Sequence, residues 1–127
     1  MAAVGTSAIV QQGFARGAPM PSDHGSAVAS LLVGTPRIRG SAAGARLWSA
    51  DVYGNDPAGG SALAIARALG WLTTQQVPVV VISLVGPTNP LLARVVDTVQ
   101  RRCRSQGGTW RGSGMSKVQL RWVLCSL

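Results

Sequence analysis

The residue best suited to acid–base chemistry in this chain is its one histidine, His24, which begins a run of small residues. An imidazole titrates near neutral pH, so it can take a proton from a nucleophile and pass it to a leaving group. Ser22 or Asp23 can cap the helix that follows, and this helix would hold the ring in a fixed direction. A lone histidine is more often a polar surface or capping residue, so the elements around it must decide its role.

The residues on either side of His24 predict alternating helices and strands, each bounded by a glycine, a proline or a capping residue. This order predicts an α/β layered sheet with right-handed crossovers. The Val-rich segment is a continuous β-branched run, which is typical of a parallel strand covered on both faces. In chain order the expected elements are a short strand around Ile9 and Val10, a helix at 24–33, a strand at 45–53, a helix from Ser61 to about Leu72, a strand at 77–84 and a helix beginning at Asn89 and Pro90.

Three of these segments resemble parts of the subtilisin-like serine peptidases. Residues 23–34 resemble the histidine helix of that family, residues 45–52 the strand that follows it, and residues 79–87 the strand that lines the substrate. The resemblance covers roughly residues 13–100. It implies a fragment of a three-layer subtilisin-like domain, with a parallel sheet flanked by helices, and serine-type endopeptidase activity in which His24 is the catalytic base.

The same resemblance implies a substrate-binding strand end at Ser83, Leu84, Val85 and Gly86. There an extended peptide would pair with the main chain, while pockets beside the strand would select its side chains. The alternative is an ordinary buried strand that runs into a Gly-Pro turn. The order of the elements after His24 favours the substrate-binding interpretation.

The other catalytic residues of the family have no counterpart in the chain. No Asp or Glu precedes Asp23, which is better placed to cap the helix than to hold the neighbouring ring. Gly5-Thr6-Ser7-Ala8 echoes the sequence around the family's serine, but the residues after it differ and Ser7 precedes the histidine, so a loop is favoured. We therefore expect the chain to be inactive alone, with a non-catalytic peptide-binding module or a nonfunctional remnant as alternatives.

Residues 1–100 are expected to form a partial peptidase domain, and residues 101–127 a basic tail that does not match the family. The net charge of the chain is +8, of which residues 101–127 contribute +6 without a single acid. The family would place a Gly-Asn pair in this part to donate to the oxyanion, but no asparagine follows Asn89. The composition favours a shifted reading frame near residue 101, or a disordered tail.

The tail also allows a nucleic-acid interpretation, since cations bind phosphates and its Trp110 and Trp122 could stack on bases. No groove-binding motif accompanies them, so specific nucleic-acid binding is not expected. The expected partner is a peptide or protein substrate, and this expectation comes from the resemblance alone.

Composition sets the remaining expectations. A chain of 127 residues with 46% hydrophobic residues predicts a packed globular domain. It contains no apolar run of about 18 residues that would predict a membrane span. Its start lacks the features of a signal peptide, so an extracytoplasmic location is implied only by the resemblance. Cys103 and Cys125 lack partners at metal-ligand spacing, so no metal or other cofactor is expected.

Overall fold

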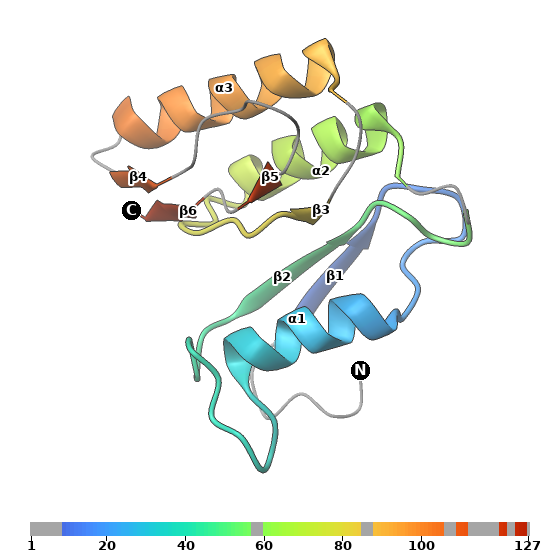
Figure 1. Cartoon of the computed structure of the whole chain (residues 1–127), viewed down its shortest axis with the longest axis vertical. Coiled ribbons are helices and arrows are strands. Elements are labelled where there is room, and N and C mark those ends of the chain that lie inside the picture. The colour runs from blue at the N-terminus through green and yellow to red at the C-terminus, as the bar shows by residue number, and fades with distance from the viewer. Residues whose placement is uncertain are drawn as a thin grey trace. The chain divides into compact units, whose positions relative to one another are not determined.

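The protein has an α/β fold with three helices and a two-stranded parallel sheet among its described residues (Figure 1). The structure is a computed structural model that describes residues 9–56, 60–84, 88–105, 109–111, 120–121 and 124–126. The chain divides into two compact units, Met1–Gly60 and Ser61–Leu127. In chain order the elements are β1 (Ile9–Gly13), α1 (Asp23–Val33), β2 (Leu47–Asp51), α2 (Ala62–Thr74), β3 (Ser83–Leu84), α3 (Pro90–Ser105), β4 (Thr109–Arg111), β5 (Leu120–Arg121) and β6 (Leu124–Ser126).

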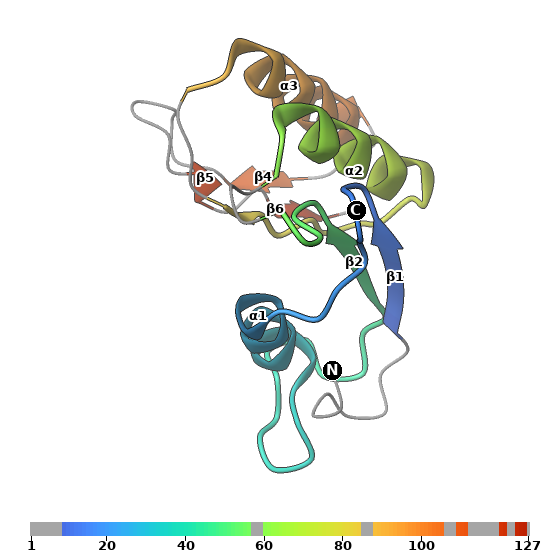
Figure 2. The ribbon, with the colours of Figure 1, turned by 90° about the vertical axis from the view of Figure 1, so that its right-hand side faces the viewer.

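The first unit is built on the parallel pair of β1 and β2, whose register runs from Ile9 opposite Leu47 to Gly13 opposite Asp51. The helix α1 connects the two strands in the chain and lies on one side of them (Figures 1 and 2). Its buried residues, Ala29 and Val33, are four positions apart and so share one face of the helix. The strand near Ile9 and the helix that carries His24 are therefore confirmed, and the next expected strand is shortened to β2.

The end of α1 depends on a close approach of two glycines. Gly34 has a φ of 89°, a value that favours glycine, and its amide donates to the Ser30 carbonyl at 2.9 Å. A Cβ on Gly34 would collide with the Gly40 amide at 2.6 Å. This contact turns the chain back, so that Ser41 donates to the Leu31 carbonyl at 3.0 Å and satisfies part of the helix end.

The second unit is organised by the side-by-side packing of α2 and α3. Its buried cluster consists of Leu69 from α2, Val96 from α3, and Val80 and Ile82 from the segment between them. Below the helices in Figure 1, β3 pairs antiparallel with β5, and β4 pairs antiparallel with β6. The helices expected after Ser61 and from Pro90 are both present, and α3 continues to Ser105.

The long parallel strand expected at 77–84 is wrong. Only Ser83 and Leu84 form a strand, β3, and its partner β5 runs antiparallel to it. Within the preceding segment Val80 and Ile82 are buried while Val79 keeps 40% of its surface exposed, so the segment is covered on one face rather than two. Pro78 contributes to this outcome because it has no amide hydrogen to donate to a sheet.

Ser61 caps α2, and this cap gives a direct test of the second unit. Its hydroxyl accepts a hydrogen bond from the Ala64 amide at 3.1 Å. We expect Ser61→Ala to lower the free energy of unfolding by about 1 kcal/mol, because the first turn loses an acceptor. Ser61→Asp should retain the stability, since a carboxylate also accepts there. Urea unfolding followed by circular dichroism measures both, and equal stabilities for the alanine and aspartate variants would contradict the cap.

Candidate functional site

His24 is the second residue of α1, and its side chain is exposed. Ser22, not Asp23, is the capping residue: its hydroxyl accepts from the Gly25 amide at 3.0 Å, and its carbonyl accepts from the Ser26 amide at 2.9 Å. A Cβ on Gly25 would stand 2.9 Å from the Ser22 hydroxyl oxygen. Glycine at this position therefore leaves space for the Ser22 hydroxyl that caps the helix.

The loop that leads from β1 to α1 is held by the Asp51 carboxylate at the end of β2. Its Oδ2 accepts from the Met20 amide at 2.8 Å, across 31 residues of sequence. Its Oδ1 accepts from the amides of Tyr53 and Gly54 at 2.9 and 3.0 Å. The Asp51 carbonyl also accepts from the Phe14 amide at 2.9 Å. Asp51 thus forms hydrogen bonds with both ends of the loop before α1, at Phe14 and Met20, and with the turn that follows β2.

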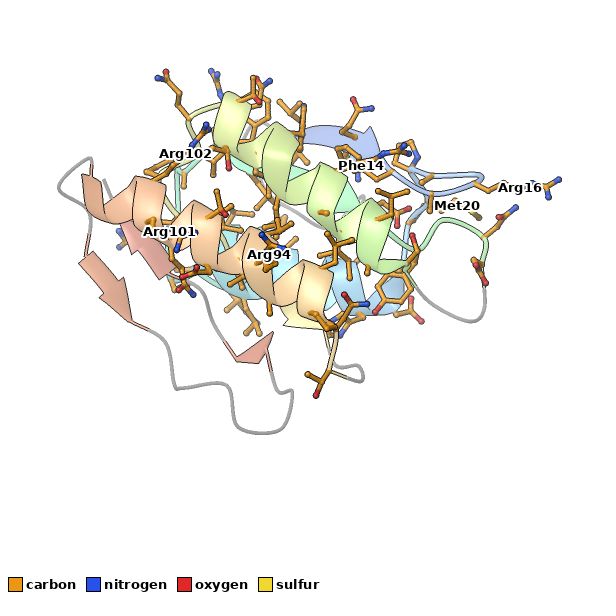
Figure 3. The ribbon with its side chains drawn as sticks, turned by 90° about the horizontal axis from the view of Figure 1, so that it is seen from above. Phe14, Arg16, Met20, Arg94, Arg101 and Arg102 are labelled. Carbon is orange, nitrogen blue, oxygen red and sulfur yellow. The ribbon has the colours of Figure 1, made fainter. Side chains whose placement is uncertain are left out.

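Gly54 completes this arrangement. It has a φ of 56°, and a Cβ at this position would overlap the carbonyl of Arg16. The next residue, Asn55, donates its amide to that same carbonyl at 3.1 Å. Figure 3 shows the Arg16 side chain extending away from this loop. The contact between the two loops is therefore made by backbone groups, with glycine required where they come closest.

Electrostatics favour the charged form of Asp51. Partial burial raises the pKa of the carboxyl, but the three amide donors, from Gly54, Met20 and Tyr53, together lower it by more, so the pKa lies below its usual value. The sequence placed Asp51 in a strand and missed this role. The signal was present in the Asp51-Val52-Tyr53-Gly54 segment, because an Asp followed by a turn containing glycine often accepts from the backbone two or three residues later.

The other sequence-predicted site residues lie in different parts of the chain. Ser83 and Leu84 form β3 in the second unit, opposite Arg121 and Leu120 of β5, whereas His24 belongs to the first unit. Val85, Gly86 and the serine considered as a nucleophile, Ser7, lie outside the described residues.

Within the described part of the chain, no group of three or more His, Cys, Asp or Glu side chains could hold a metal ion. No helix among these residues has the length and apolar character needed to cross a membrane. The chain matches no known protein-family model, and the search of curated proteins found no match. Any functional assignment therefore depends on the residues and their geometry.

The lowered pKa of Asp51 predicts a pH-dependent stability. Because the carboxylate is stabilised in the folded state, its contribution is complete above the unfolded-state pKa and disappears as the pH falls through the folded-state pKa. Asp51→Asn keeps one acceptor oxygen but replaces the other with a donor group. The variant should be less stable than the unchanged chain at about pH 7, and the difference should shrink towards about pH 3.

Urea unfolding at a series of pH values measures this difference. Asp56→Asn is the matched control, because Asp56 is an exposed acid close by in the sequence whose carboxyl accepts none of these three amide hydrogens. A loss of stability in Asp51→Asn that is the same at every pH would show that the charge of the carboxylate does not matter.

Proposed function

We propose that residues 13–100 are part of a subtilisin-like serine peptidase domain in which His24 is the general base of peptide-bond hydrolysis. The observation that carries the proposal is the exposed imidazole on the capped first turn of a helix that connects two parallel strands. The elements from α1 to α3 follow the expected order of helix, strand, helix, strand and helix, although β3 is only two residues long and pairs antiparallel with β5. The finer fold, a three-layer domain with a parallel sheet flanked by helices, belongs to this proposal.

The geometry suits proton transfer. An imidazole in the first turn of a helix is anchored through its backbone, while its ring stays accessible to a substrate. In serine peptidases such a ring takes the proton from the serine hydroxyl and then gives it to the leaving amine. A carboxylate on the second ring nitrogen keeps the correct tautomer. The neighbouring residue, Gly25, has no side chain that could cover the ring.

The proposed substrate contact is the strand end from Ser83 to Gly86, where a peptide would pair with main-chain groups. The resemblance implies a parallel strand here, whereas β3 pairs antiparallel with β5. This part of the proposal therefore has less support than the role of His24. The proposal for this chain therefore depends mainly on the histidine.

We expect no proteolysis by the 127-residue chain, because its sequence offers neither the Asp nor the Ser of the triad, and no asparagine follows Asn89 to donate to the oxyanion. A fluorogenic peptide library and denatured casein are suitable substrates, and His24→Ala is the matched variant. Both proteins should release product at the rate of buffer alone. Turnover by the unchanged chain that His24→Ala abolishes would show that the catalytic set is complete after all.

The family proposal itself is tested on the gene. If the reading frame shifts near residue 101, one of the other two frames should encode a Val-rich strand ending in Gly-Asn at this point. Sequencing the genomic DNA around this codon and translating all three frames supplies the measurement. Absence of such a strand from both other frames would contradict the frameshift and count against a peptidase domain, because the gene would then encode no oxyanion asparagine at this point.

A further inference from the structure

The segment that follows α1, residues 34–42, forms a narrow loop held by its own backbone. Thr35 and Ile38 exchange two hydrogen bonds: the Thr35 amide donates to the Ile38 carbonyl at 2.8 Å, and the Ile38 amide donates to the Thr35 carbonyl at 3.3 Å. The Thr35 hydroxyl also accepts from the amides of Arg37 and Ile38 at 3.3 and 3.1 Å. Pro36 and Arg37 therefore lie at the turn of this loop.

The base of the loop is joined to the end of α1. The Ser41 amide and hydroxyl both donate to the Leu31 carbonyl at 3.0 Å, and the Ala42 amide donates to the Leu32 carbonyl at 2.6 Å. Figures 1 and 2 show the loop, in cyan, extending away from α1 and from the β1–β2 pair. Because hydrogen bonds hold the loop at its base and near its turn, it loses little conformational freedom when its outer end contacts a partner.

The outer end of the loop combines positive charge with an exposed apolar side chain. Ile38 keeps 69% of its surface exposed, and the arginines on either side of it are exposed as well. Neither Arg37 nor Arg39 pairs with an acid among the described residues. Residues 24–50 contain these two arginines and Arg46 but no Asp or Glu, so no acid nearby in the sequence offsets their charge.

This combination fits the surface of an anionic bilayer. Negatively charged headgroups attract arginines that lie close to them, and the boundary below the headgroups accepts apolar side chains. Arginine side chains are long and flexible, so their charged ends can stay with the phosphates while an isoleucine between them reaches deeper. A projecting side chain enters a bilayer without a matching pocket, whereas a protein partner would need one.

A nucleic acid fits the loop less well. Single strands bind through cations together with aromatic side chains that stack on the bases, and residues 34–46 contain no aromatic residue. Cations alone would hold a polyanion without any contact to Ile38. The exposed isoleucine is therefore the feature that favours lipid.

We infer that the loop after α1 binds the first unit to anionic membrane surfaces, with Arg37 and Arg39 at the lipid phosphates and the Ile38 side chain inserted below them. The contact is peripheral and reversible, since two cations and one apolar side chain attach a protein only weakly. The loop lies at the end of α1 opposite His24, about 14 Å along the helix axis. The contact therefore does not use the histidine, and the inference does not depend on the proposed peptidase chemistry.

The test measures cosedimentation of the full chain with vesicles of equal parts phosphatidylglycerol and phosphatidylcholine, and with vesicles of phosphatidylcholine alone. We expect binding to the anionic vesicles that weakens as salt is added, and little binding to the neutral ones. Arg37→Gln/Arg39→Gln should bind the anionic vesicles roughly 10- to 30-fold more weakly, because each arginine near such a surface strengthens binding about fivefold. Ile38→Gln keeps every charge and should bind about fivefold more weakly, because an apolar side chain no longer leaves water.

Matched variants separate the loop from the other cations and apolar residues of the chain. Arg67→Gln/Arg94→Gln removes the same charge from exposed positions of the second unit, and Leu63→Gln removes an apolar side chain that is 53% exposed there. Both should bind almost as the unchanged chain does. Circular dichroism checks that every variant keeps its helices.

A further variant reports on insertion directly. Ile38→Trp should bind the anionic vesicles more tightly than the unchanged chain, since tryptophan is favoured at the membrane interface. Brominated lipids quench the fluorescence of a tryptophan that lies among them. They should therefore quench the Ile38→Trp variant more than the unchanged chain when both are bound.

Four results would each overturn the inference. One is absence of binding to the anionic vesicles, which would leave a protein partner as the occupant of the loop. Another is equal binding by the unchanged chain and Arg37→Gln/Arg39→Gln, which would assign the binding to other cations of the chain. The third is a loss in Ile38→Gln no greater than that in Leu63→Gln, together with no added quenching in Ile38→Trp. The fourth is tighter binding of an oligothymidylate than of the vesicles, with the same dependence on the two arginines, since this would identify the loop as a contact for nucleic acid.

Discussion

The arrangement of the first unit depends on the hydrogen bonds that the Asp51 carboxylate accepts. Parallel strands need a long connection, and here the connection from β1 to β2 contains both a loop and the helix α1. The Met20 amide, four residues before His24, donates to this carboxylate. The same side chain also accepts from the turn that follows β2. The Asp51 carboxylate therefore fixes the start of α1 relative to the end of β2, and His24 lies in the first turn of this helix.

A different constraint organises the second unit. There two helices pack against one another, and the extended segment after α2 supplies Val80 and Ile82 to their shared core. The helices cover one side of this segment (Figures 1 and 2). In this segment Val80 and Ile82 are buried, and Val79 between α2 and these residues is exposed. Alternate burial of this kind is the pattern of an extended chain that is covered on one face. Packing of the helices also brings the arginines of α3 to the edge of α2, where they line a groove.

The positive charge of the chain is distributed unevenly along the sequence. A net charge of +8 first suggests nucleic acid, with six of the cations in the last 27 residues. Among the described residues, Arg94 and Arg102 line a groove between α2 and α3, and Arg101 forms an ion pair with Asp97.

Local signals in the sequence were sufficient to predict the three helices and the strands flanking α1, because caps, glycines and prolines act within a few residues. They also identified His24 at the start of α1, although they left open whether Ser22 or Asp23 was the cap. The tertiary structure alone decided that Val77–Ile82 stays outside a strand, since sheet formation needs partners distant in the chain. It alone also revealed the hydrogen bond from the Met20 amide to Asp51 and the groove between α2 and α3, because both involve residues that are distant in the sequence.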